Sequence, residues 1–201
     1  KDIGLPHTDL DIRLKEKEEV QLGFKDKLIN KVLLLTNKLT PSFLNKIVII
    51  APYIGIGKLF KWQLQLGQLP FLSREQNFNL SKNTNNKKRD LLKDDNAKDG
   101  YEQLLDRLII NLIPLNYVEN FDIFFKNSIS CFPKKPSVIY TANAYQANDS
   151  FKFWLAHFKE KKIPFVLGQH GGNMGIAKIN QTEDHQVKVA DTFLSWGWHY
   201  N

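Results

Sequence analysis

Strand-like and helix-like segments alternate through the last third of the chain, and this alternation limits the possible folds more than any other feature of the sequence. Three runs rich in β-branched and aromatic residues, at 137–141, 164–168 and 193–196, are separated by segments with helical apolar spacing at 149–161 and 183–191. Strands joined by single helices pair in parallel. The pattern therefore predicts an α/β fold class, a Rossmann-like parallel sheet flanked by helices, with these three strands as neighbours.

Short polar residues mark where the two intervening helices begin. Asp149 and Thr182 are residue types that cap helix N-termini, so we expect each of them to cap the helix that follows. Phe151, Trp154 and Phe158 then fall on one face of the first helix. This face is predicted to pack against the sheet.

The upstream part of the chain is divided into a helical N-terminal segment, 1–45, and the start of a Rossmann-like α/β domain, 46–201. A β-branched run at 46–51 predicts a buried strand. Residues 73–100 are rich in Asn, Lys and Asp and poor in apolar residues, so we expect a solvated polar insertion that contributes little to stability. Further helices are predicted at 58–66, 101–113 and 117–126.

Composition and charge exclude several classes of protein. With 42% hydrophobic and 24% charged residues among 201, the chain is composed like a globular domain and unlike a collagen, a coiled coil or a disordered protein. The net charge of +7 is carried almost wholly by Lys, whereas nucleic-acid readers favour Arg. We therefore expect anionic substrates or a charged membrane surface as partners, and no nucleic acid. A single cysteine, Cys131, fits a reducing, cytoplasmic compartment.

A glycine-rich block, GQHGGNMG at 168–175, directly follows the second of the three strands. Open α/β sheets bind ligands beyond the carboxyl ends of their strands, and glycines let backbone N–H groups approach a ligand closely. His170 can accept a proton from a hydroxyl group or stabilise a phosphate. We expect the neighbouring residues Gln169, Gly171, Gly172 and Asn173 to bind substrate. The alternative is a tight turn that needs positive φ angles, with a solvated His170.

Glu183 and His185 form a second candidate group, at the start of the last predicted helix. A carboxylate and a second imidazole at this edge of the sheet would support His170 as acid, base or orienting groups. The alternative is structural, because acidic residues in a first helical turn interact favourably with the helix dipole. The histidine spacing matches no known metal site, so we expect no metal.

Three weaker candidates lie elsewhere in the chain. Glu119 is predicted on an apolar helix, from which it either projects into a substrate cleft or lies on a solvated face. The segment GIGK at 55–58 lacks the rest of a phosphate loop and is interpreted as a strand-to-helix turn. Trp196 and Trp198 are at strand spacing, so we expect them on one face of the last strand.

Three consecutive segments resemble one known family. IPFVLGQHGGNMG at 163–175, TEDH at 182–185 and ADTFLSWGW at 190–198 are similar to segments of the transferases encoded in bacterial O-antigen and surface-polysaccharide loci. Members of that family carry Q-H-G-G-x-x-G, E-D-H and A-D-x-x-L-x-W-G-W motifs, and weaker similarity extends back to about residue 45. The His-Gly pair also resembles the glycerophosphotransferases of teichoic-acid synthesis, where a His in a similar motif acts on the acceptor.

The resemblance implies a glycosyltransferase of the two-domain GT-B kind, and the second Rossmann-like domain is then expected outside this chain. It implies transfer of a sugar or related group from a nucleotide-activated donor to a glycan acceptor of the surface polysaccharide, with no further cofactor. His170 would be catalytic, supported by Glu183 and His185, in a cytoplasmic enzyme that can contact the inner membrane surface. A non-catalytic carbohydrate- or nucleotide-binding module and a structural docking half-domain are the alternatives.

Overall fold

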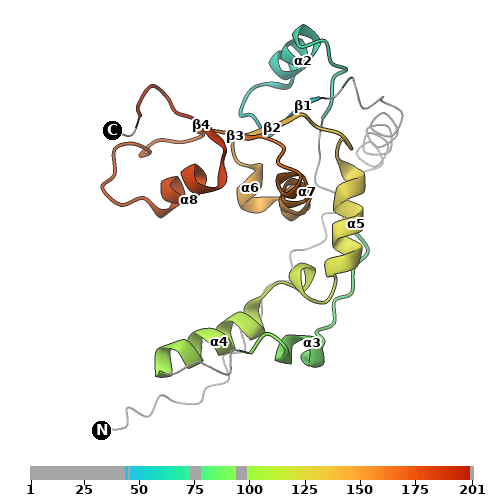
Figure 1. The fold of residues 1–201 in the computed structure, drawn as a ribbon, viewed down its shortest axis with the longest axis vertical. Helices are drawn as coiled ribbons and strands as arrows, with labels where there is room; N and C mark the ends of the chain where they lie inside the picture. Colours follow the sequence, from blue (N-terminus) through green and yellow to red (C-terminus); the bar gives the residue numbers. More distant parts are fainter. Residues whose placement is uncertain (1–43, 45, 73–77, 94–98, 200–201) are drawn as a thin grey trace.

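A four-stranded sheet, the helices that cover it and an arm that extends away from it make up the described part of the protein (Figure 1). The computed structural model describes residues 44, 46–72, 78–93 and 99–199. All but one residue of the helical segment predicted over 1–45 lies outside these described residues, so that segment stays a prediction.

The four strands pair in parallel in the order β1-β2-β3-β4. They are β1 (Ile47–Ile50), β2 (Val138–Thr141), β3 (Phe165–Gly168) and β4 (Thr192–Leu194). The α/β fold class and the three neighbouring parallel strands predicted in the last third of the chain are confirmed. The β-branched run at 46–51 joins the same sheet as its first strand, because Ile47 pairs with Val138.

Helices cover the two faces of the sheet unequally. The helices α6 (Ala144–Ala147), α7 (Asp149–Glu160) and α8 (Gln181–Val189) lie on one face, and α2 (Ile56–Gln65) lies on the other (Figure 1). The aromatic face predicted for the first helix is the face of α7 that enters the core. The largest side chains buried between α7, β2 and β3 are Phe151, Trp154, Phe158, Ile139, Phe165 and Leu167. Each of them stabilises the fold by roughly 1.5–3 kcal/mol.

Asparagines, and not the predicted Asp149 and Thr182, cap the helices α7 and α8. The side chains of Asn148 and Asn180 each accept a hydrogen bond from the backbone N–H three positions later, at 2.9 Å and 3.1 Å. Both asparagines have extended backbone and immediately precede a first helical turn. The predicted caps were therefore wrong by one and two positions, because the predicted residues already lie inside the helices.

An arm of short helices extends from the sheet (Figure 1). It consists of α3 (Asn86–Asp90), α4 (Gly100–Leu112) and η2 (Leu115–Tyr117), and the helix α5 (Phe121–Cys131) leads back from it to β2. The helix predicted at 101–113 is confirmed as α4. Most of the large apolar side chains of α4 are exposed, namely those of Tyr101, Leu104, Leu105, Leu108, Ile109 and Leu112. None of the described helices has the length and apolar content needed to cross a membrane.

The polar segment predicted as a solvated insertion is mostly exposed in its described part, residues 78–93 and 99–100. It nevertheless forms the helix α3, which its composition did not predict. Phe78 packs edge-on against Phe124 with ring centroids 5.3 Å apart, and Arg89 is buried. Because these contacts attach the segment to the rest of the chain, we expect it to contribute to stability, contrary to what its composition predicts.

Candidate functional site

Side chains that follow β1, β2 and β3 meet at the carboxyl edge of the sheet. The ring of Tyr53 stacks on the imidazole of His170, with centroids 5.8 Å apart and an interplanar angle of 9°. Asn143 Nδ2 donates a hydrogen bond to Tyr53 Oη at 2.6 Å. Sequence reasoning found His170 but missed Tyr53 and Asn143. The signal was present, because each of the three residues lies two positions beyond a predicted strand.

His170 is half-buried at this edge. Its Nδ1 atom is buried, and none of the described residues makes a hydrogen bond to that atom. An imidazole can take a proton from a hydroxyl group or, when charged, stabilise a phosphate. The ring contact that the structure gives for this imidazole is the stacking on Tyr53.

The two loops that lie beside His170 each contain non-glycine residues with a left-handed, strained backbone. Ala51 and Tyr53, in the loop after β1, have left-handed φ angles of 45° and 56°, and Asn173, in the loop after β3, has a φ angle of 67°. Conformations of this kind cost on the order of 1–3 kcal/mol each and cluster at functional sites. Both loops that border His170 thus contain left-handed non-glycine residues, a property that the turn before β3 shares at Lys162.

Gly171 and Gly172 leave open space beside the backbone next to His170. A Cβ atom at either position would meet no other atom within 4 Å, and neither glycine has a positive φ angle. A tight turn that needs left-handed glycines therefore does not explain this pair. Gly168 differs, because a Cβ atom there would lie 2.3 Å from the hydroxyl oxygen of Tyr140.

The Gln169 side chain links the loops that follow β3 and β4. Its Oε1 atom accepts hydrogen bonds from Trp196 N and Trp198 Nε1, both at 2.9 Å, and its Nε2 atom donates to Gly171 O at 2.9 Å. The last strand was predicted to run to 196, with both tryptophans on one face. It ends at Leu194 instead. Gly197, with a φ angle of 102°, turns the chain between the two tryptophans, and the backbone N–H of Trp196 and the indole N–H of Trp198 both reach Gln169.

Gly175 lies between Trp198 and Glu183, which belong to the other two segments of the family motif. Its φ angle is 76°, and a Cβ atom there would lie 2.6 Å from the indole ring of Trp198. Glu183 is buried, and its Oε2 atom accepts a hydrogen bond from Gly175 N at 2.7 Å. The three segments that carry the family resemblance therefore contact one another and form one structural unit.

The three residues predicted as catalytic occupy three different environments. His170 stacks on Tyr53, whereas Glu183 binds the backbone of Gly175. His185 is exposed, lies 6.0 Å from the ring centroid of Tyr145, and lines a cavity of about 820 Å³ between α6, α7 and α8. Among the described residues, no cluster of three or more His, Cys, Asp and Glu side chains is arranged to hold a metal ion.

Over residues 2–201 the chain matches the model of a protein family described as LIC12162 family transferase. The chain belongs to this family of transferases. No curated protein and no solved structure gives a significant match to the chain.

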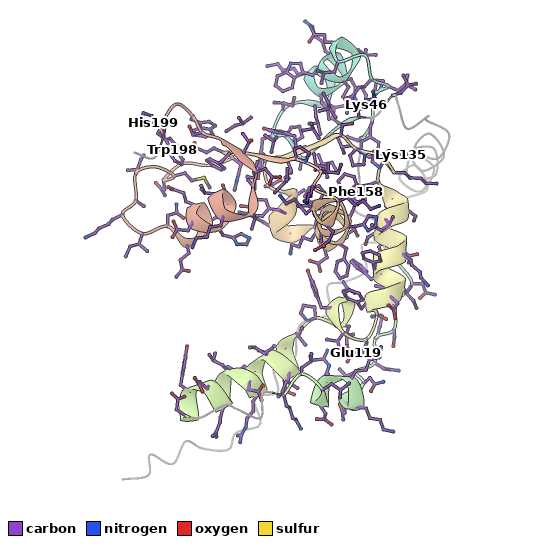
Figure 2. All side chains as sticks on the ribbon, viewed as in Figure 1. Lys46, Glu119, Lys135, Phe158, Trp198 and His199 are labelled. Carbon is purple, nitrogen blue, oxygen red and sulfur yellow. The ribbon has the colours of Figure 1, made fainter. Side chains whose placement is uncertain are left out.

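Glu119 is the remaining residue that the sequence predicted to bind substrate in this transferase. It lies in the arm, far from Trp198 and its loop (Figure 2). It is in the turn between η2 and α5 and not on the helix predicted at 117–126, which is interrupted there. Its carboxylate accepts hydrogen bonds from Arg89 Nε at 2.7 Å and Nη2 at 3.0 Å, and from Asn85 N at 2.9 Å. The Arg89 guanidinium lowers the pKa of Glu119 to about 2. These contacts give Glu119 a structural role.

Proposed function

We propose that this transferase moves a sugar or related group from a nucleotide-activated donor to a hydroxyl group of a surface-polysaccharide acceptor, with His170 as the general base. The observation that carries the proposal is the position of His170 beyond β3, beside the open backbone at Gly171 and Gly172. Open α/β sheets bind ligands at this edge. Membership of a transferase family supports the reaction class.

In the proposed reaction, the oxygen of an acceptor hydroxyl group attacks the anomeric carbon of the donor sugar. A glycosidic C–O bond forms while the bond from that carbon to the phosphate oxygen of the nucleotide breaks, and the hydroxyl proton passes to His170. The leaving phosphate oxygen keeps the electron pair of the broken bond. The backbone N–H groups of Gly171 and Gly172 would donate hydrogen bonds to that negative charge.

The other motif residues would act on the shape of this loop. Gln169 accepts hydrogen bonds from Trp196 and Trp198, and Glu183 accepts one from Gly175. Gln169 and Glu183 therefore each restrain one end of the loop that carries His170. We assign proton transfer to His170 alone, because Glu183 is already engaged by the backbone and His185 lines a separate cavity. A second Rossmann-like domain of the GT-B kind would supply most nucleotide contacts, and the acceptor would be met at the cytoplasmic membrane face.

A non-catalytic carbohydrate- or nucleotide-binding module is the second candidate function. The observation that favours it is the exposure of two aromatic side chains near the sheet edge, since Tyr53 and Trp196 are each 65% exposed. Aromatic rings stack on sugars and bases. A binding module would need these rings but not the His170 imidazole as a base.

The two functions are separated by a binding panel followed by a turnover assay on the full-length protein. Thermal shifts with UDP-glucose, UDP-N-acetylglucosamine, GDP-mannose and dTDP-rhamnose identify the donor that binds, and release of the free nucleotide measures turnover. We expect His170→Ala to lower kcat by roughly 10²–10⁴-fold, the range typical of a lost general base. The melting temperature should change little, because a half-buried loop imidazole buries little apolar surface.

His185→Ala is the matched control, because it removes an imidazole that lines the separate cavity. We expect its kcat to fall far less than that of His170→Ala. Unchanged turnover in His170→Ala would refute the proposed catalytic role. Donor binding with no turnover in the wild-type protein, whichever acceptor is supplied, would favour the binding module.

A further inference from the structure

The ring of His170 lacks the contact that usually orients a catalytic imidazole. In such bases one ring nitrogen exchanges the proton, while the N–H of the other donates a hydrogen bond to a third group that orients the ring. In this chain the Nδ1 atom of His170 is buried, and no described residue makes a hydrogen bond to it. The glycines at 171 and 172 directly follow His170 and restrain its backbone weakly. None of the described residues therefore orients the ring through a hydrogen bond at Nδ1.

Tyr53 is the side chain that stacks on this ring. Its ring lies nearly parallel to the imidazole, at 9°, with the centroids 5.8 Å apart. Its own position is fixed from two sides, by the left-handed backbone at Tyr53 and by the 2.6 Å hydrogen bond from Asn143 Nδ2 to its hydroxyl oxygen. Ala142 N donates to Ala51 O at 3.2 Å, which ties the loop after β1 to the loop after β2.

We propose that Tyr53, anchored by Asn143, is a positioning residue that sets the orientation of the His170 imidazole. This inference rests on the proposed function, in which His170 is the base. In this left-handed backbone conformation the exposed Tyr53 ring stacks on the imidazole, and such conformations cluster at functional sites. Tyr53 acts through His170 and takes no proton itself.

The inference predicts a modest, specific loss of turnover. Aromatic pairing of this kind changes an equilibrium by a factor of roughly 3–10, so Tyr53→Leu should lower kcat by roughly 3–10-fold and leave KM nearly unchanged. Tyr53→Phe keeps the ring and loses the hydrogen bond from Asn143, so its kcat should lie between those of the wild type and Tyr53→Leu. In the His170→Ala background, Tyr53→Leu should have no further effect on kcat, because the group through which it acts is gone.

A second readout does not depend on turnover. The ring current of Tyr53 shifts the ring-proton NMR resonances of His170 from those of an unstacked imidazole, and these resonances are assigned from their disappearance in His170→Ala. We expect this ring-current shift in the wild type, an altered one in Tyr53→Phe and none in Tyr53→Leu. The resonances of His185, which faces Tyr145, are the internal control and should not move in any of these variants.

The two readouts keep the inference and the proposed function apart. A ring-current shift that Tyr53→Leu abolishes, together with full turnover in His170→Ala, would show that Tyr53 stacks on His170 and that the proposed function is wrong. The inference itself is overturned if wild-type His170 shows no ring-current shift, or if Tyr53→Leu lowers kcat equally with and without His170. In that case the turnover of His170→Ala still decides the proposed function.

Discussion

Removing the negative charge of Glu119 by Glu119→Gln should weaken the arm without affecting donor binding. The carboxylate pairs with Arg89 at 2.7 Å, and the two side chains are only 4% and 7% exposed. Arg89 also donates hydrogen bonds to Ile110 O at 2.6 Å and Ile113 O at 2.9 Å, at the C-terminal end of α4. Glu119→Gln leaves this guanidinium without its counter-charge, so the contacts that join α3 to α4 weaken together.

The magnitude follows from the lowered pKa of Glu119. A shift from 4.5 to about 2 corresponds to about 3.4 kcal/mol of stability at neutral pH if each pKa unit is worth about 1.36 kcal/mol. The arm is thin, so screening by the surrounding solvent reduces this upper value. An uncompensated buried Arg89 acts in the opposite direction. We therefore expect Glu119→Gln to lower the free energy of unfolding by about 2 kcal/mol.

The pH dependence gives the sharper test, by urea unfolding of the wild type and the variant at several pH values. Because the folded pKa of Glu119 is lowered, its contribution is complete above pH 4.5 and is lost as the pH falls towards 2. The difference between wild type and Glu119→Gln should therefore shrink from pH 7 to pH 3. Glu160→Gln, at an exposed position at the end of α7, is the control and should change stability little at any pH. A difference independent of pH, or a loss of donor binding at unchanged stability, would refute the structural role of Glu119.

Two further predictions test the geometry of the site and of the helix starts. Gly175→Ala should lower the free energy of unfolding by roughly 2–3 kcal/mol, because a residue with a left-handed φ angle gains a Cβ atom 2.6 Å from Trp198. Gly171→Ala places its Cβ atom in open space and should be nearly neutral. Equal losses of stability in thermal unfolding of the two variants would contradict this expectation. Asn148→Ala should cost about 1 kcal/mol in chemical unfolding, because it removes the cap of α7, and an unchanged midpoint would show that Asn148 does not cap the helix.

The strands and the core helix were predictable because their signals are local. The β-branched runs and the spacing of Phe151, Trp154 and Phe158 each lie within about a dozen consecutive residues, and burial of these residues reinforces the local preference. The caps were missed by one or two positions, because Asp, Thr and Asn have similar propensities at a helix start. Which of them caps is decided by the path of the incoming chain.

The missed site residues and the ion pair depend on contacts between distant parts of the sequence. Tyr53 meets Asn143 across 90 positions, and Arg89 meets Glu119 across 30. Local pattern places Tyr53 and Asn143 just beyond predicted strands, but it does not show that these two side chains meet, nor that Arg89 pairs with Glu119. For His170 the sequence predicted the edge of the sheet at which it lies, but the side chain that covers its ring follows from the pairing of β1 with β2.

The pairing of β1 with β2 also determines when the site forms during folding. Ile47 pairs with Val138, 91 positions later, whereas Ile139 pairs with Phe165, only 26 positions later. Closing the longer loop costs about 1 kcal/mol more in chain entropy, so β2, β3 and β4 are expected to associate first and β1 to dock last. Tyr53 arrives with β1. A chain that is still folding therefore carries an imidazole with no ring against it, and the site is completed only by the last strand to dock.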